Sequence, residues 1–264
     1  MALDSSRRRT WRPEFGKGPL IIAHRGASAR ATENTLAAFG RALADGADGV
    51  ELDVQCCRTG EVVVFHDDDL TRLAGRPERI DALPLDALRE VSLRGGGEVT
   101  TLAEALDVCG PEALVNVEIK CADILPGVAL IDRVADAIAR AGAGPRVLVS
   151  SFSPGAIWLW RRRHPVVPCA LLFERPRPFH RPWPLRTDAL LPLLRPFAVH
   201  PEERLCTPRS VARWRHRGYA VNAWTVDAPE RIEALIDMGV SGIVTNDPVK
   251  ARYVLTLTRR SAGG

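Results

Sequence analysis

The chain has 264 residues, and its length and composition set the first limits on what it is. Hydrophobic residues make up 46% of the chain and charged residues 26%, which is typical of soluble globular proteins and argues against disorder. The net charge of +4, from 36 basic and 32 acidic side chains, is too small to indicate a nucleic-acid partner. This length suits a single domain, such as an α/β barrel of roughly 250 residues.

The sequence shows no secretion or membrane signal. Residues 1–18 are polar, and the basic run Arg7–Arg9 lies where a signal peptide needs its apolar stretch, so we expect a flexible tail here. No later run approaches the roughly 20 apolar residues of a spanning helix. The six cysteines form no Cys-x-x-Cys pair, which favours reduced thiols. We therefore expect a cytoplasmic protein without a transmembrane segment.

Short apolar runs rich in β-branched residues alternate with longer helical patterns, which is typical of parallel βα units. The predicted strands are Leu20–Ala23, Gly49–Val54, Leu114–Ile119, Arg146–Ser150, Ala170–Phe173, Phe197–His200, Ala220–Val226 and Gly242–Thr245. The predicted helices are Thr35–Ala44, Gly127–Ala141, Pro154–Arg163, Thr207–Arg217 and Pro229–Met238. Eight strands favour a closed TIM (β/α)8 barrel over residues 19–255, followed by a tail at 256–264, with reactive residues at the carboxyl ends of the strands.

Two stretches depart from simple βα spacing. Residues 55–111 separate the second and third strands and contain a further strand, Val62–Phe65, and helical pieces at Leu85–Arg89 and Leu102–Val108, so they predict a small inserted subdomain. Residues 174–196 are dense in proline and arginine, which predicts a loop on the catalytic face with at most one short helix.

Acidic residues cluster at the ends of two predicted strands. In Glu51-Leu52-Asp53 the alternation of a strand turns both carboxylates into the barrel, a pattern that suits a salt-bridged pair and a metal site equally. Glu118 adds a third inward carboxylate, and three oxygen ligands without Cys or His favour Mg²⁺, Ca²⁺ or Mn²⁺ over zinc. Lys120, on the same face, could hold a phosphate or form a salt bridge with Glu118.

Two histidines follow apolar runs, His24 in His-Arg-Gly and His66 in Phe-His-Asp. Either one alone is more often an ordinary surface or core histidine. Together they could supply the base and the acid that displacement at phosphorus requires, because histidine titrates near neutral pH.

These motifs, in this order, resemble the glycerophosphodiester phosphodiesterase family. The resemblance also rests on Glu33-Asn34-Thr35, Val117–Lys120, Trp224–Asp227 and Gly239–Pro248, and it runs from about Leu20 to Ala251. It implies hydrolysis of glycerophosphodiesters to glycerol 3-phosphate and an alcohol. By residue, it implies an acid–base pair of His24 and His66, a divalent cation on Glu51, Asp53 and Glu118, a phosphate held by Arg25 and Lys120, and a pocket wall at Trp224.

Some points stay open. Thr32 stands where the family pattern has proline, the 174–196 loop matches no family pattern, and Trp224 could equally be a core tryptophan. A lysophospholipase D-like or sphingomyelinase D-like phosphodiesterase and a catalytically silent phosphate-binding barrel are the alternatives. The Gly-x-Ser-x-Gly, Gly-x-Gly-x-x-Gly and P-loop motifs are absent. The substrate is expected to be a glycerophosphodiester or a lysophospholipid. The sequence does not identify its head group, nor does it identify the metal.

Overall fold

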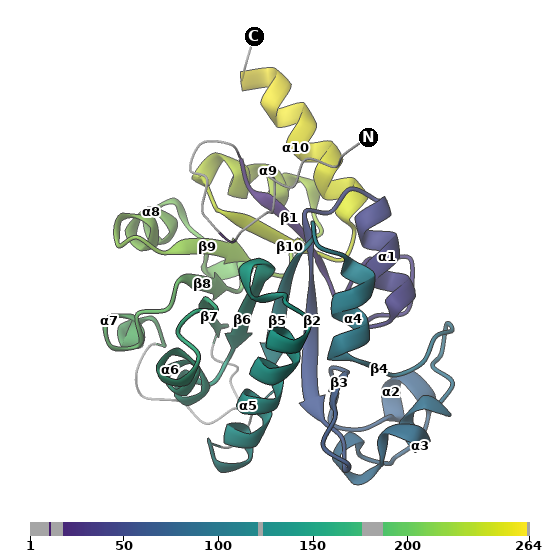
Figure 1. Ribbon diagram of the computed structural model, residues 1–264. Helices are drawn as coiled ribbons and strands as arrows, with labels where there is room; N and C mark the ends of the chain where they lie inside the picture. The colour runs from purple at the N-terminus through teal and green to yellow at the C-terminus, as the bar shows by residue number, and fades with distance from the viewer. Residues whose placement is uncertain (1–10, 12–17, 121–123, 176–186, 263–264) are drawn as a thin grey trace, which may run out of the picture.

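The computed structural model describes residues 11, 18–120, 124–175 and 187–262 and shows a ring of parallel strands surrounded by helices (Figure 1). The ring follows the order β1-β10-β9-β8-β7-β6-β5-β2, and β2 pairs with β1 to close it. The TIM barrel prediction is therefore confirmed. The barrel strands are β1 (Leu20–His24), β2 (Gly49–Cys56), β5 (Leu114–Ile119), β6 (Val147–Ser151), β7 (Cys169–Phe173), β8 (Ala198–Pro201), β9 (Ala220–Ala223) and β10 (Gly242–Thr245).

The outer layer consists of helices that follow the strands. Their bounds are α1 (Leu36–Ala44), α4 (Leu102–Cys109), α5 (Ile124–Arg140), α6 (Pro154–Arg163), α7 (Leu191–Leu194), α8 (Pro208–His216), α9 (Pro229–Met238) and α10 (Pro248–Ala262), with short 3₁₀ turns at Gly144–Arg146, Thr187–Leu190 and Glu203–Leu205. Thr35, Ser153 and Thr207 each cap a helix by accepting a backbone N–H with the side-chain oxygen. These caps explain why the sequence located the helix starts to within a few residues.

Side chains of β2 alternate between the helices and the barrel interior. Val50, Leu52 and Val54 lie in the core between strands and helices, whereas Glu51 and Asp53 turn inward. In the parallel register of β2 and β5, Asp53 pairs with Glu118, so the two strands carry their acidic residues to the same level. The strand alternation thus positions the site.

The inserted subdomain comprises residues 57–101 and packs around a small core of its own. It contains β3 (Val62–Val64), which pairs antiparallel with β2, β4 (Thr100–Thr101), α2 (Thr71–Ala74), a 3₁₀ turn (Ile80–Ala82) and α3 (Leu85–Arg89). The predicted insertion, 55–111, was too long. Helix α4 begins at a capping box of Thr101 and Glu104 and packs against α1 and α5, so it belongs to the barrel.

The predicted C-terminal tail needs correction over residues 256–262. Helix α10 continues to Ala262, because no glycine or proline interrupts residues 249–262, and its Ala251 and Leu255 are buried against the barrel. In the N-terminal segment the structure describes Trp11, which is only 5% exposed and donates from Nε1 to the Arg146 carbonyl at 2.9 Å. Trp11 packs against inward-facing residues near the amino ends of the strands and closes that end of the barrel.

Replacing Trp11 with Ala is expected to lower the free energy of unfolding by about 3–5 kcal/mol, the usual range for removing a buried aromatic side chain. Urea unfolding at equilibrium measures this change. Trp158→Ala is the matched control, since Trp158 is 46% exposed and its loss should cost less than about 1 kcal/mol. Equal losses in the two variants would show that Trp11 does not close the barrel.

Two further sequence expectations concern membrane segments and thiols. No helix in the described ranges combines the length and the apolar composition that a membrane crossing requires. The five described cysteines are free thiols, and four of them are buried. The cytoplasmic location stays a prediction.

Candidate active site

Three buried carboxylates converge at the carboxyl ends of β2 and β5. Glu51, Asp53 and Glu118 are 4%, 1% and 7% exposed, and one oxygen from each lies within 4.8 Å of the others. The sequence predicted this cluster from strand alternation. Burial of three like charges at this separation requires compensation from cations.

Two basic side chains supply part of that compensation. Lys120 Nζ lies 2.8 Å from Glu118 Oε1 and 3.1 Å from Asp53 Oδ1. Arg25 Nε lies 3.3 Å from Asp53 Oδ2, and the Arg25 backbone N–H donates to Glu51 Oε2 at 3.0 Å. The salt bridge that the sequence left open for Lys120 is thus present, and Lys120 contacts Asp53 as well.

The pKa values show that this compensation is incomplete. Burial and the neighbouring acids Asp53 and Glu118 raise the pKa of Glu51 well above its usual value, and burial and Asp53 raise the pKa of Glu118 to about 7. Although burial opposes it, the charges of Lys120 and Arg25 lower the pKa of Asp53 to about 2. Two of the three acids are therefore costly to ionise at neutral pH.

The donor set fits a divalent cation. Glu51 Oε1 is buried and has no hydrogen-bond partner among the described residues. The cluster offers carboxylate oxygens and neither sulfur nor imidazole nitrogen, which is the ligand chemistry of Mg²⁺, Ca²⁺ or Mn²⁺. Glu51, Asp53 and Glu118 could therefore hold such an ion, whose charge would relieve their repulsion.

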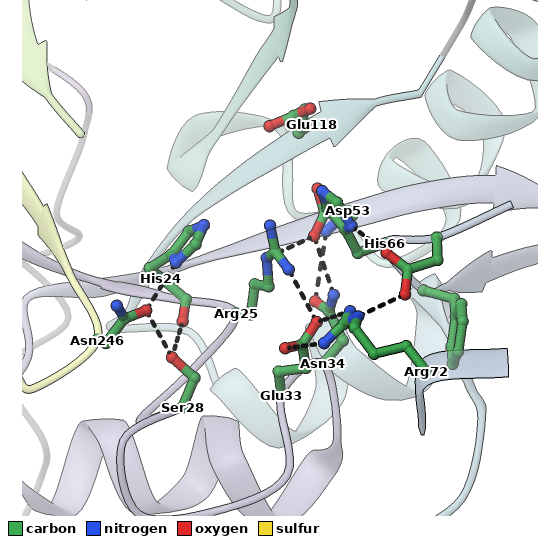
Figure 2. A network of polar contacts seen from close by, with 12 residues as sticks. His24, Arg25, Ser28, Glu33, Asn34, Asp53, His66, Arg72, Glu118 and Asn246 are labelled. Atoms are coloured by element: carbon green, nitrogen blue, oxygen red, sulfur yellow. Dashed lines mark hydrogen bonds and ion pairs between the residues drawn. The ribbon is translucent and has the colours of Figure 1, made fainter. Parts of the chain in front are cut away.

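His24, at the end of β1, is held by an amide. Its Nδ1 lies 2.7 Å from Asn246 Oδ1, which also accepts from Ser28 Oγ at 2.8 Å (Figure 2). Asn246 Nδ2 donates to Asp227 Oδ2 at 2.6 Å. Because the amide oxygen accepts, His24 carries a proton on Nδ1, and its Nε2 has no hydrogen-bond partner among the described residues. Burial and the charge of Arg25 lower the pKa of His24, which favours the neutral form.

His66, in the loop after β3, is held by a carboxylate. Its Nδ1 lies 2.6 Å from Asp67 Oδ1. The loop is fixed to β2 by Gln55, whose Nε2 donates to the carbonyls of Phe65 and Asp67 at 3.0 and 2.8 Å. Burial lowers the pKa of His66, while the charge of Asp53 and the hydrogen bond that the ring makes to the Asp67 carboxylate act in the opposite direction. In the described part of the chain, Nε2 of His66 likewise has no hydrogen-bond partner, and the Asp67 carboxylate on Nδ1 stabilises the charged form of the ring.

Trp224 follows β9 and is partly exposed at the barrel mouth. Its Nε1 donates to the His200 carbonyl at 2.7 Å, and its ring meets Phe152 edge to face, with centroids 5.4 Å apart and planes at 86°. Phe152 follows β6 and is 40% exposed. Since β7 and β8 separate β6 from β9, the pair spans part of the mouth. Trp224 also packs on the apolar residues inside the barrel, so it is in part a core residue, and its role as a pocket wall stays a prediction.

Several residues at the site were not predicted, although Glu33, Asn34, Asp227 and Asn246 lie in motifs that the sequence displayed. Asn34 Nδ2 donates to Asp53 Oδ2 at 2.9 Å, and Arg72 joins Glu33 to Asp67. Ser28, Glu33, Asp227 and Asn246 contribute to a neighbouring cavity of about 420 Å³. No local pattern connects these side chains, because they come from loops far apart in sequence. Of the predicted 174–196 loop, residues 176–186 lie outside the described residues.

His200, in β8, lies in the barrel interior and is 1% exposed. Its Nε2 accepts from Asn222 Nδ2 at 2.9 Å, and burial lowers its pKa to about 3. A histidine this deep, with its ring nitrogen already bonded, is a structural group.

We expect His200 to make the fold sensitive to acid. The folded pKa of about 3 lies below the ordinary 6.5, so the unfolded chain binds more protons between these values, and this contribution to stability is full above pH 6.5 and is lost as the pH falls. By pH 5 the loss should reach about 2 kcal/mol. Urea unfolding at pH 7 and pH 5 should show a smaller loss for His200→Gln than for the unchanged protein. Equal losses would contradict this assignment.

Comparisons with known proteins address the family. The model of the glycerophosphoryl diester phosphodiesterase family matches residues 24–250. The chain belongs to this family. Among its relatives, the glycerophosphodiester phosphodiesterase of Caldanaerobacter subterraneus is 33% identical over 87% of this chain and 94% of the relative. A probable glycerophosphodiester phosphodiesterase of Mycobacterium tuberculosis is 32% identical over 92% of this chain and 95% of the relative. The predicted enzyme class, a phosphodiesterase, is thereby confirmed.

Solved structures of phosphodiesterases share the fold. A putative glycerophosphoryl diester phosphodiesterase from Silicibacter pomeroyi superposes with a TM-score of 0.84 at 25% identity and covers 92% of this chain and 95% of its own. A phosphodiesterase from Oleispira antarctica, in complex with the product sn-glycerol-3-phosphate, gives a TM-score of 0.80 at 25% identity and covers 90% and 97%. The sequence comparisons and the fold comparisons therefore both support membership of the glycerophosphoryl diester phosphodiesterase family.

Proposed function

We propose that this phosphodiesterase hydrolyses glycerophosphodiesters to glycerol 3-phosphate and an alcohol by acid–base catalysis at His24 and His66, with a divalent cation held by Glu51, Asp53 and Glu118. The observation that carries the proposal is that both histidines are fixed through Nδ1 beside a cluster of three buried carboxylates. The solved Oleispira antarctica relative contains sn-glycerol-3-phosphate, which supports the same product here.

The partners of the two histidines suggest different roles. His24 is bonded to the uncharged amide of Asn246, which does not favour a protonated ring, so His24 is the better base. It would take the proton from the nucleophile, which is the neighbouring hydroxyl of the substrate if a cyclic phosphate forms first, and otherwise water. His66 is bonded to the Asp67 carboxylate, which stabilises the imidazolium, so His66 is the better acid toward the leaving alkoxide. In each case Nε2 exchanges the proton and Nδ1 keeps the ring oriented.

The cationic side chains complete the site. Arg25 and Lys120 lie at the edge of the carboxylate cluster and could contact phosphate oxygens, where positive charge stabilises the charge that develops during displacement. A bound divalent cation would supply further Lewis-acid stabilisation of the phosphoryl oxygens. Trp224 and Phe152 offer partly exposed aromatic surface to the organic part of the substrate.

A substrate screen tests the proposal. Purified protein would be given glycerophosphocholine, glycerophosphoethanolamine, glycerophosphoinositol, bis(glycerol) phosphate, a lysophosphatidylcholine and sphingomyelin, in chelator and with added Mg²⁺, Ca²⁺ or Mn²⁺. We expect cation-dependent release of glycerol 3-phosphate from at least one glycerophosphodiester. Turnover of sphingomyelin alone, or of no diester under any condition, would reject the proposed reaction.

A further inference from the structure

The two histidines of the proposed acid–base pair are carried by different parts of the fold. His24 ends a strand of the barrel, whereas His66 lies on the inserted subdomain. The geometry between them therefore depends on how the subdomain is attached to the barrel, through β2 on one side and through the β1–α1 loop on the other. A displacement of about 1 Å can cost on the order of 100-fold in rate, so this attachment matters for catalysis.

Arg72, in helix α2 of the subdomain, bridges the two parts. Its Nη1 and Nη2 donate to Glu33 Oε2 and Oε1 at 2.8 and 2.7 Å, which makes a two-bonded ion pair with the β1–α1 loop. Its Nε donates to Asp67 Oδ2 at 2.6 Å, and the other oxygen of Asp67 holds His66. One guanidinium thus uses three N–H groups to tie the partner of His66 to the barrel (Figure 2).

The barrel end of this bridge is itself fixed at the carboxylate cluster. Glu33 Oε1 also accepts from Arg25 Nη1 at 2.8 Å, and Arg25 contacts Asp53 and Glu51. The bridge therefore runs without interruption from His66 through Asp67, Arg72, Glu33 and Arg25 to the proposed cation ligands. In Figure 2 Arg25 lies between His24 and the group that contains His66 and Asp53.

The charges and the geometry suit a rigid connection. Arg25 and Arg72 balance Glu33 and Asp67, and the Glu33 side chain is only 17% exposed. Although partial burial opposes it, hydrogen bonds from Arg72 and the charge of Arg25 hold the pKa of Glu33 below its usual value, so Glu33 remains ionised. The planar fork of an arginine fixes both partners at once, which a lysine ammonium cannot do.

We propose that Arg72 is a positioning residue that sets His66 at its working distance from His24 and the carboxylate cluster. This inference rests on the proposed function. Arg72 does not contact the reacting atoms; it acts through Asp67 on the ring of His66 and through Glu33 on the barrel. The loss of Arg72 therefore affects the rate of the chemical step and leaves substrate binding nearly unchanged.

The experiment compares Arg72→Met with a matched control, Arg79→Met. Arg79 lies in the same subdomain, is 56% exposed and forms an equivalent two-bonded ion pair with Asp81, but this pair lies within the subdomain. We expect Arg72→Met to lower kcat by about 10- to 100-fold with KM within about twofold, and Arg79→Met to leave both unchanged. A Tm near that of the unchanged protein confirms that each variant is folded.

The His66→Ala background separates this inference from the proposed function. If Arg72 acts through His66, adding Arg72→Met to His66→Ala lowers kcat no further. A further, multiplicative loss of kcat in the double variant would overturn the positioning role, and so would an unchanged kcat in Arg72→Met alone. A raised KM as the main effect of Arg72→Met would also overturn it, because a raised KM indicates contact with the substrate. Full activity of His66→Ala itself would instead reject the proposed function.

Two further variants keep the test decisive if Arg72→Met folds poorly. Arg72→Lys retains the charge and should recover only part of the rate, because one ammonium cannot bond both carboxylates in the same geometry. Arg72→Ala should regain rate with millimolar guanidinium, with saturation, whereas Arg79→Ala should not respond. Full activity of Arg72→Lys, or no response to guanidinium by Arg72→Ala, counts against positioning by the guanidinium fork.

Discussion

Replacement of Glu51 by Gln is expected to lower kcat/KM by about 1,000-fold or more while the fold is retained. Glu51 has a buried oxygen without a hydrogen-bond partner among the described residues, and its pKa is raised by burial and by Asp53 and Glu118. An amide of the same shape removes the ligand charge that a divalent cation needs. The lost transition-state stabilisation of about 4 kcal/mol corresponds to that factor.

The same substitution should raise the thermal stability of the protein when no cation is bound. At neutral pH the buried Glu51 carboxyl is unfavourable to ionise, so Glu51→Gln should have a higher Tm than the unchanged protein in chelator. Added Mg²⁺, Ca²⁺ or Mn²⁺ should raise the Tm of the unchanged protein and not that of the variant. Glu233→Gln, at an exposed position of α9, is the matched control. Full turnover in excess chelator would contradict cation dependence.

The barrel could be predicted from the sequence because its signals are local. Each strand is a short apolar run, and each of several helices begins at a capping Thr or Ser. The wrong predictions concern the hydrophobic core against which a helix or a residue packs. The pattern of residues 102–108 showed a helix but not that its apolar face packs on α1 and α5, and a lone Trp11 in a polar segment carries no periodic signal for burial.

The carboxylate cluster could be predicted for the same reason, since alternation along β2 and β5 is a property of each strand by itself. The connections around it could not. Arg72 contacts Glu33 across 39 positions and His24 contacts Asn246 across 222 positions, and both contacts depend on loops brought together only by closure of the ring. The contacts of Asn246 and Arg72 are therefore visible in the structure alone, whereas Asp67 directly follows His66 in the sequence.

Replacing His24 or His66 with Ala is expected to lower kcat by at least about 100-fold each, the usual scale for losing one positioned proton-transfer group. The double variant should be little slower than the slower single variant, because both groups serve one displacement. Steady-state rates on a responsive glycerophosphodiester measure these effects. His216→Ala, at an exposed position of α8, should retain full activity.

A change of leaving group distinguishes the two histidines. An alkoxide needs a proton as it departs, whereas p-nitrophenolate does not, so a p-nitrophenyl ester of glycerol phosphate should restore much of the rate of His66→Ala and little of that of His24→Ala. Equal recovery in both variants would contradict the assignment of His66 as the acid. Restoration of His24→Ala alone would reverse the roles, and the carboxylate of Asp67 would then serve to orient a base rather than to stabilise an acid.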